Sequence, residues 1–495
     1  MNKQKSNIFS GGGVTPLNKR RVLLKSYVWG HIVSNRLASL LNSIKGRFKN
    51  LTLIGNSVQG ENPSPDNPQE IKSAGRKSKN LFNIADLRVG QVQKDGAINE
   101  KATTYRTAIL DVPEDGKYRI TFAENNDYNM LYFAEMYTNG VYSQPYVRVR
   151  AGNPNHYITL AKGKNILSFS THTASGNIDF TTDHNIMIAA ESETTDYEPY
   201  GYFFDLKITG KNIFNKNAAK QGYEFGSAAT DVETAKQGWF VSDFMPVKAI
   251  TYYISGKATG SGCKLYNKDK VFVKNTQVPF GNIKFDEGIA YFRINGEIKD
   301  LDTVQVEEGN VVTPYEPYRE QTVQIALDEP LSGIGEYKDT ITKDGVVRKI
   351  KRAVFDGSED EHWFINNERE NVIHFVPHRL GDAIKINEGQ RSMMDKLKWS
   401  SGVWNRDEVG QDMFAGILRI NMPKDLAPNL QTFKTWLSQN PLTVDYVLAE
   451  PVTEPLPESV QQQLQALHSE NGTTHVFVDS GEVEAGISVT YKQKK

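Results

Sequence analysis

The sequence predicts a mainly β fold: an N-terminal helix, two tandem jelly-roll sandwiches and a C-terminal domain of mixed, mainly β structure. Two short strings recur in the same order, "KNLFN" (79–83) with "KNIFN" (211–215), and "YEPY" at 197–200 and 315–318. Such internal repeats indicate a duplicated module. Segments that alternate apolar and polar residues, as strands do, run between these markers. Aromatic residues, which favour strands, make up 10% of the chain.

We expect the two repeats to span residues 79–205 and 206–320. Their final segments align without a gap, so that Ile186 and Ile188 fall on Val304 and Val306. Turn pairs such as Asn295-Gly296 separate the strand candidates, as they do in two-sheet sandwiches. The proline of each YEPY copy ends the last strand. We interpret YEPY as a plug whose two tyrosine rings cover the open end of a sandwich, rather than as a ligand-binding motif.

Residues 1–50 differ from the rest of the chain in charge. They contain ten Lys or Arg and no Asp or Glu, whereas the other 445 residues carry 48 basic and 59 acidic side chains. We interpret this segment as a basic extended arm and an amphipathic helix from about Tyr27 to Phe48. The apolar residues at helical spacing are Val33, Leu37, Leu40, Leu41, Ile44 and Phe48. This stripe is expected to anchor the chain on a neighbouring protein or to bundle with copies of itself; a membrane-surface helix is a third interpretation.

Two further segments complete the predicted organisation. Residues 51–78 are expected to form a strand, "LTLIG", and a Pro-rich linker, because closely spaced prolines exclude a helix. Residues 321–495 are expected to form a β-rich domain with two short helices, at 429–438 and 457–469. Asp344-Gly345, between "DTIT" and "VVRKI", is a strong hairpin signal.

The sequence offers few signs of chemistry. Cys263 is the only cysteine, so no intrachain disulfide is possible. We find no nucleophile elbow, phosphate loop or dinucleotide fingerprint. No apolar run approaches the ~18 residues that a membrane span needs. We therefore expect no enzymatic activity, no cofactor, no metal, no nucleic-acid partner and no membrane partner.

Sugar binding has some support, because sugars stack their C–H groups on flat aromatic faces. Several aromatic residues stand in polar, Gly- or Ser-containing surroundings or cluster along the chain. The candidate glycan contacts are Trp239, Trp399, Trp404, Tyr128, Tyr132 and Tyr137. For each of them the competing interpretation is an ordinary aromatic residue of a sandwich.

Longer strings resemble a known class of protein. "SVQGENPSPDNPQEIKSAG", "VQVEEGNVVTPYEPY", "IALDEPLSGIGEYKDTITKDGVVRKIKRAVFDGSED" and "FKTWLSQNPLTVDYVLAEPVTEPL" are similar to tail fibre and baseplate structural proteins of phages that infect Gram-positive bacteria. The resemblance covers about residues 51–455. It implies carbohydrate-binding-module-like jelly rolls joined to a C-terminal β domain, in a non-enzymatic, receptor-binding part of the virion tail that is extracellular after release.

The resemblance also implies partners. They are other tail or baseplate proteins, host cell-wall carbohydrate, and copies of the same chain in a homo-oligomer, commonly a trimer. Two other functions stay open: a wall-glycan depolymerase whose acid pair is distant in sequence, and a head fibre or capsid decoration protein.

Overall fold

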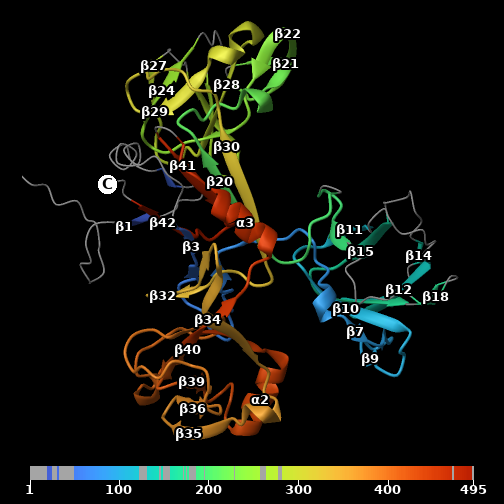
Figure 1. Cartoon of the computed structure of the whole chain (residues 1–495). Helices are drawn as coiled ribbons and strands as arrows, with labels where there is room; N and C mark the ends of the chain where they lie inside the picture. The colour runs from blue at the N-terminus through green and yellow to red at the C-terminus, as the bar shows by residue number, and fades with distance from the viewer. Residues whose placement is uncertain are drawn as a thin grey trace, which may run out of the picture. The chain divides into compact units, whose positions relative to one another are not determined.

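The chain is mainly β and divides into two compact units. The computed structural model describes residues 19–24, 31–32, 50–121, 131–143, 146–148, 156–170, 172–173, 176–177, 186–193, 196–227, 229–256, 263–276, 281–470 and 473–492. One unit consists of Arg76–Phe203 and Ala326–Glu329. The other consists of Met1–Gly75, Phe204–Ile325 and Pro330–Lys495. Figure 1 traces the strands of both units.

The unit Arg76–Phe203 contains the first repeat, built from two antiparallel sheets. The larger sheet has the order β13 (Val141–Ser143), β12 (Leu131–Thr138), β16 (Gly163–Ser170), β10 (Tyr105–Val112) and β7 (Arg88–Val89), and β14 (Tyr146–Arg148) also pairs with β12. The smaller sheet has the order β15 (His156–Leu160), β11 (Gly116–Thr121) and β19 (Met187–Ala190). One core cluster is made of residues from both sheets, including Leu110, Ile120, Leu167 and Ile188.

The second repeat, in the other unit, has the same strand order. Its larger sheet runs β26 (Phe272–Thr276), β25 (Cys263–Tyr266), β28 (Tyr291–Glu297), β22 (Glu233–Val241) and β21 (Lys220–Phe225), and β23 (Met245–Pro246) also pairs with β28. Its smaller sheet runs β27 (Gly281–Lys284), β24 (Thr251–Ser255) and β29 (Gln305–Glu308). Phe240, Tyr252, Phe292 and Val306 belong to its core cluster, so side chains from both sheets again meet in one core.

Short elements decorate the two repeats. The paired strands are β8 (Gln91–Val92) with β9 (Ile98–Asn99), and β17 (His172–Thr173) with β18 (Gly176–Asn177). The 3₁₀ turns are η1 (Ile84–Asp86), η2 (Lys216–Ala218) and η3 (Ile298–Thr303).

Most of the remaining strands form three larger sheets. The first is β2 (His31–Ile32), β41 (His475–Asp479), β20 (Tyr202–Thr209) and β30 (Glu320–Leu327), with β6 (Arg76–Lys77) pairing to the start of β20. The second is β1 (Lys19–Leu24), β42 (Gly486–Lys492), β3 (Asn50–Ile54), β33 (Thr340–Thr342), β34 (Gly345–Phe355), β40 (Leu442–Glu454) and β37 (Ser392–Met394). The third is β35 (Phe364–Glu368), β36 (Val372–Val376), β39 (Ile417–Pro423) and β38 (Gly410–Phe414).

The two helices predicted near the C-terminus are confirmed. α2 (Leu430–Gln439) begins with a capping box between Asn429 and Thr432, and it buries Phe433 and Leu437 in the C-terminal core. α3 (Glu458–Ala466) follows β40. The small elements of this region are the ladders β4 (Ser57–Val58) with β5 (Lys72–Ser73) and β31 (Gly333–Ile334) with β32 (Tyr337–Lys338), and the turns η4 (Glu359–Glu361) and η5 (Val403–Asn405).

The N-terminal segment departs from its prediction wherever it is described. Lys19–Leu24, expected as part of a basic extended arm, forms the edge strand β1 and pairs with β42 along its whole length. His31 and Ile32, expected at the start of the helix, form β2 and pair with β41. Pairing distant in sequence therefore overrides the local helical pattern there. The stripe residues Val33, Leu37, Leu40, Leu41, Ile44 and Phe48 lie outside the described residues.

The first marker of each repeat ties the start of the repeat to its last strand. The buried Asn80 carboxamide oxygen accepts the amides of Phe82 (2.9 Å) and Ile188 (3.0 Å). Asn212 repeats this arrangement with Phe214 (3.0 Å) and Val306 (3.1 Å). The marker thus recurs because each copy needs the same buried bridge.

The YEPY marker is only partly the plug that was expected. Tyr197 and Tyr315, the first tyrosine of each copy, are 37% and 47% exposed, so these two rings do not close a sandwich. The second tyrosines, Tyr200 and Tyr318, are half-buried. The intervening glutamates form ion pairs instead: Glu198 with Arg76 at 2.8 Å, and Glu316 with Lys211 at 3.4 Å.

Candidate functional site

The predicted glycan contacts do not form one site. Trp239 lies half-buried on β22, with the Lys236 Nζ 3.5 Å from its ring centroid. Tyr137 lies on β12 of the other repeat, where its ring packs so closely on Gly96 that a Cβ there would lie 2.7 Å from it. Tyr128 lies outside the described residues. Tyr132 is on β12, but its side chain lies outside the described part of the chain.

The two remaining candidates lie near the C-terminal four-stranded sheet. Trp404, in η5, is 46% exposed, and its carbonyl oxygen accepts a hydrogen bond from Arg369 Nη2 (3.2 Å). Trp399 is half-buried and forms an isolated bridge with Gln411. The candidates are thus spread over both repeats and the C-terminal region.

A cleft of about 530 Å³ lies beside the second repeat, between β20, β30 and β41 on one side and the 244–246 segment with Tyr291 and Lys270 on the other. β20 and β41 run antiparallel, with Asp205 opposite Asp479 and Lys207 opposite Phe477. On β20, Leu206 is buried, whereas Asp205 and Lys207 are partly exposed. Strand alternation therefore places a polar pair on the cleft side.

The wall formed by the second repeat is aromatic. Phe244 is half-buried, and its ring centroid lies 4.8 Å from Tyr266 and 5.9 Å from Tyr291, both edge-on. The Lys270 ammonium lies 5.1 Å from the Phe244 centroid. Burial raises the pKa of Tyr291 far above its usual value, and the charges of Asp479 and Asp243 act in the same direction. The Tyr291 hydroxyl therefore stays protonated and can donate a hydrogen bond.

The opposite wall offers oxygen and nitrogen groups. The Asp205 Oδ1 accepts a hydrogen bond from the exposed Gln324 Nε2 (2.7 Å). The Asp479 Oδ1 accepts a hydrogen bond from the backbone amide of Gly481 (3.0 Å). Lys207 forms an ion pair with Glu320 at 2.9 Å. Each of these groups retains further hydrogen-bonding capacity for a ligand.

A smaller pocket of about 60 Å³ shares Lys207, Phe244, Pro246 and Phe477 with the cleft. Its lining includes Ile213–Asn215 of "KNIFN" and Tyr318 of "YEPY". Both repeated markers therefore reach the same pocket. Its volume suits water or a small substituent rather than a sugar ring.

Aromatic walls, carboxylates, an amide and ammonium groups within one cleft suit a small ligand that has both apolar faces and hydroxyl groups. The cleft escaped the sequence analysis because its residues come from six separate segments. Only the two repeated markers gave a signal near it.

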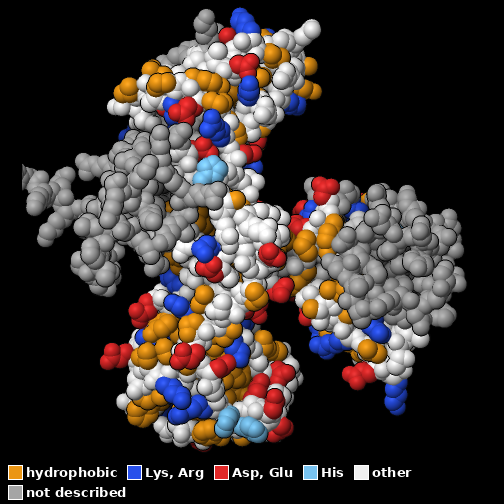
Figure 2. Space-filling model, viewed as in Figure 1, with side chains coloured by type: hydrophobic (Ala, Val, Ile, Leu, Met, Phe, Trp, Pro, Cys, Tyr) orange, Lys and Arg blue, Asp and Glu red, His pale blue; other side chains and the backbone are white. Residues whose placement is uncertain are grey.

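On the face that Figure 2 displays, basic and acidic side chains of the described residues are interspersed rather than gathered by sign.

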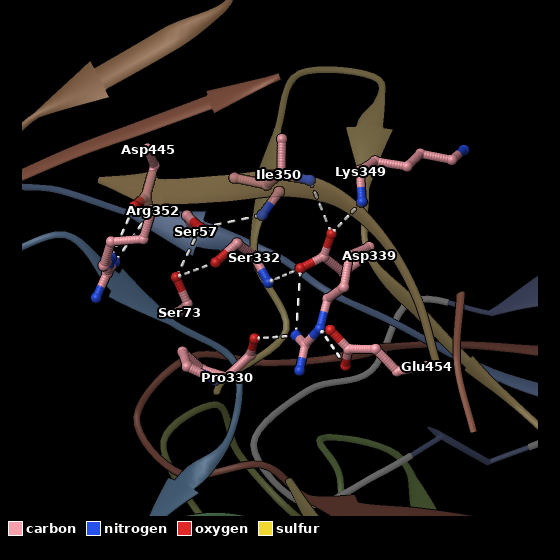
Figure 3. A network of polar contacts seen from close by, with 12 residues as sticks. Ser57, Ser73, Pro330, Ser332, Asp339, Lys349, Ile350, Arg352, Asp445 and Glu454 are labelled. Carbon is pink, nitrogen blue, oxygen red and sulfur yellow. Dashed lines mark hydrogen bonds and ion pairs between the residues drawn. The ribbon is translucent and has the colours of Figure 1, made fainter. Parts of the chain in front are cut away.

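A second polar cluster lies in the seven-stranded sheet, and it is structural. The buried Asp339 carboxylate accepts the amides of Ser332 (3.0 Å), Lys349 (2.7 Å) and Ile350 (3.0 Å). Arg348 donates to the Pro330 carbonyl and pairs with Glu454 at 3.1 Å. Figure 3 shows Ser332, Lys349 and Ile350 converging on the Asp339 carboxylate, with Pro330 and Glu454 beside them. Because the carboxylate is held by protein donors on every side, this cluster stabilises the sheet and leaves little room for a ligand.

Two searches of the described residues bear on metals and membranes. No group of three or more His, Cys, Asp or Glu side chains in the described ranges is placed to hold a metal ion. No helix in the described part of the chain has the length and apolar composition of a membrane span. Comparison of the chain with protein-family models, curated proteins and solved structures gave no match.

Proposed function

We propose that the chain is a structural protein of a phage tail fibre or baseplate that binds a glycan of the host cell surface. The observation that carries the binding function is the 530 Å³ cleft beside the second repeat. Its volume lies within the ~300–1,000 Å³ of small-ligand sites, and its aromatic and polar walls match the two surfaces of a sugar. The virion location rests on the sequence resemblance.

In this proposal the paired six- and three-stranded sheets are jelly-roll sandwiches akin to carbohydrate-binding modules. Residues 1–50 attach the chain to other virion proteins, and the β regions project outward. Several copies in a homo-oligomer would present several cleft sites. Weak single sites then gain avidity without any new contact.

The cleft is tested by sedimentation of the full chain with protein-free cell walls of a Gram-positive host. Phe244→Ala removes half of the aromatic wall, and Gln324→Ala removes an exposed amide without touching a core. Each is expected to weaken wall binding at least about fivefold, since a lost ligand contact is worth about 1 kcal/mol. Trp239→Ala and Trp404→Ala are matched controls that lie outside the cleft lining.

Two outcomes would contradict the cleft. Binding that survives both cleft substitutions but is lost in Trp239→Ala or Trp404→Ala would move the site elsewhere. A wild-type chain that does not sediment with walls at all would remove glycan binding from the proposal. The virion location is tested separately: immunogold labelling of particles is expected to mark the tail, and label on the capsid would favour a head fibre.

One observation favours the enzymatic alternative. Asp205 and Asp479 stand directly opposite each other in the cleft, and two nearby carboxylates are what glycoside hydrolysis requires. Each carboxylate already accepts a hydrogen bond from the protein, which fits a positioning role. Incubation with purified wall glycan should release no new reducing ends. If it does, and Asp205→Asn abolishes the release, the chain is a depolymerase.

A further inference from the structure

The larger sheet of the second repeat has one face in the core and one face turned away from it. Phe292 and Ile294 of β28 belong to the core cluster. Arg293 and Asn295 alternate with them and therefore point to the other face. Lys264 of β25 is the direct cross-strand partner of Arg293 and lies on that face as well. We call this the outer face.

Lys264 is a buried lysine without a carboxylate partner. Its side chain belongs to a residue that is 1% exposed, and among the described residues its ammonium donates only to the carbonyl oxygen of Ser227. No Asp or Glu of the described chain lies within 4.0 Å of it, whereas most lysines of the second repeat have such a partner. Burial lowers the pKa of Lys264, and the more distant Asp231 opposes this shift.

The neighbouring charges make this arrangement more unusual. Arg293, directly opposite Lys264, pairs with Glu233 at 2.8 Å. Glu233 also pairs with Lys220 at 2.7 Å, so a single carboxylate serves two cations while Lys264 receives none. Two like charges directly opposite each other on adjacent strands destabilise a sheet. Among the described residues, Lys264 is therefore a cation of this face that no carboxylate contacts directly.

Unsatisfied polar atoms lie on the same face. Asn295 is 1% exposed, and within the described ranges neither its carboxamide oxygen nor its nitrogen has a hydrogen-bond partner. Asn275, the cross-strand partner of Lys264 on β26, has a buried Oδ1 that likewise has no partner among the described residues. Buried polar groups without partners are rare and each requires an explanation. Asn275 therefore places an acceptor without a described partner at the strand position directly opposite Lys264.

The cover over Lys264 is thin. It is the end of the β21–β22 hairpin, closed by the hydrogen bond from the Gly226 amide to the Val232 carbonyl (3.0 Å). Ser227, which accepts the Lys264 ammonium, is itself exposed. Lys264 thus lies directly beneath an exposed residue of the described surface.

The first repeat provides an internal comparison. β16 and β28 hold the same place in the two larger sheets, and Ser168 lies between the core residues Leu167 and Phe169 as Arg293 lies between Phe292 and Ile294. Ser168 pairs across the sheet with Glu135, as Arg293 pairs with Lys264. Glu135 is also buried. The same position therefore holds an acidic residue in one repeat and a basic residue in the other.

We propose that the outer face of the second repeat holds a subsite for an anionic group, a carboxylate or phosphate, carried by the bound glycan. This inference rests on the proposed function and adds a chemical class to it. Lys264 supplies the charge, and the Asn275 carboxamide oxygen on the neighbouring strand supplies an acceptor for a sugar hydroxyl. Charge-assisted hydrogen bonds of this kind are about twice as strong as neutral ones. The first repeat, with Glu135 in place of the lysine, has no such subsite.

The test is saturation-transfer NMR on the full chain with three probes: glucose, glucuronate and glucose 6-phosphate. The wild type is expected to bind one or both anionic probes about tenfold tighter than glucose. Lys264→Met keeps the aliphatic stem against Phe225 and Phe272 but removes the charge, and it should abolish this preference. Lys264→Arg should retain part of it. Lys274→Met, on β26 and ion-paired to Asp286, is the control with an equal change in net charge.

The outcomes separate this inference from the proposed function. Preference for glucuronate alone or for the phosphate alone identifies the group that the subsite takes. Equal binding of all three probes, or a preference that survives Lys264→Met, overturns the subsite while wall binding through the cleft can still stand. If Lys264→Met loses the anion preference but the cleft substitutions leave wall binding unchanged, the subsite is supported and the cleft is rejected as the wall-binding site. Absence of signal from all probes also overturns it.

Discussion

Asn80 and Asn212 each join two parts of a repeat that are about a hundred residues apart. Asn212 Oδ1 accepts the amides of Phe214 and Val306, and its Nδ2 donates to the Glu316 carbonyl at 3.0 Å. Asn80 makes the equivalent bonds to Phe82 and Ile188. A side chain with both a donor and an acceptor is needed, so asparagine cannot be replaced by an apolar residue of the same size.

We expect Asn212→Ala to destabilise the second repeat by about 3 kcal/mol, because two buried amides lose their acceptor. Hydrogen exchange read by mass spectrometry should show faster exchange at Val306, whose amide is one of the two. Asn215→Ala is the control: it removes only the cap of η2, where Asn215 accepts the Asn217 amide (3.0 Å), and should cost about 1 kcal/mol. Equal exchange at Val306 in both variants would contradict the bridging role.

A second residue predicts a pH dependence. His475 on β41 is fully buried, and burial lowers its pKa to about 4; the charge of Lys248 acts in the same direction. Between pH 6.5 and 4 the unfolded chain therefore binds more protons at this residue than the folded chain does. The free energy of unfolding is therefore not reduced by His475 above pH 6.5. It falls by about 3 kcal/mol as the pH is lowered from 6.5 to 4.

The measurement is the melting temperature of the wild type and of His475→Leu between pH 4 and 8. The melting temperature of His475→Leu minus that of the wild type should increase as the pH falls from 6.5 to 4. Above pH 7 this difference should stay constant. His468→Leu, which replaces a half-exposed histidine, should follow the wild type throughout. Parallel curves for the wild type and His475→Leu would show that His475 is not held neutral.

Among the elements, β34 depends on one side chain outside it. Its pairing with β40 is interrupted by a bulge between Arg348 and Ile350. Asp339 accepts the amides of Lys349 and Ile350 at this bulge, so two donors that the ladder leaves unpaired are satisfied. Arg348 reaches the same carboxylate at 3.5 Å. One aspartate therefore fixes where the longest strand pair of the sheet changes register.

Asp339→Ala should destabilise the C-terminal region by about 3–5 kcal/mol, as removal of one partner of a buried charged cluster does. Tryptophan fluorescence during urea unfolding can follow it, because four of the six tryptophans lie at 363, 399, 404 and 436. Asp344→Ala, at the exposed tip of the neighbouring hairpin, should change the unfolding free energy by less than about 0.5 kcal/mol. A similar loss in both variants would argue against the bulge as the reason.

Elements defined by neighbouring residues were the ones that the sequence predicted well. The Asp344-Gly345 hairpin lies between β33 and β34, and α2 falls within one residue of its predicted range, because its cap and its buried Phe433 and Leu437 are local signals. β1 and β2 were missed because their partners, β42 and β41, lie more than 400 residues away. The cleft was missed for the same reason: Asp205 and Asp479 meet only through strand pairing.

At the scale of the whole molecule, the two ends of the chain share one sheet. β1 pairs with β42, from Lys19 opposite Lys492 to Leu24 opposite Ile487. β42 also pairs with β3 on its other side, so β1 is an edge strand and the sheet persists without it. The basic segment thus covers an edge that would otherwise expose the unpaired groups of β42.

This arrangement separates the folding role of the N-terminal segment from its proposed anchoring role. A chain that lacks residues 2–49 keeps β3, which begins at Asn50, and should fold with unchanged far-ultraviolet circular dichroism over its β regions. It should self-associate more readily, because β42 becomes an edge strand. Under the proposed function it should be absent from purified phage particles, as judged by immunoblot. The companion variant keeps the full chain and changes Lys19, Arg20 and Arg21 together to Ala. If incorporation is lost in both the deletion and this variant, the basic charge is the anchor. If it is lost only in the deletion, the anchor lies in the rest of the segment. Normal incorporation of the deleted chain would show that residues 1–50 serve the chain's own sheet alone.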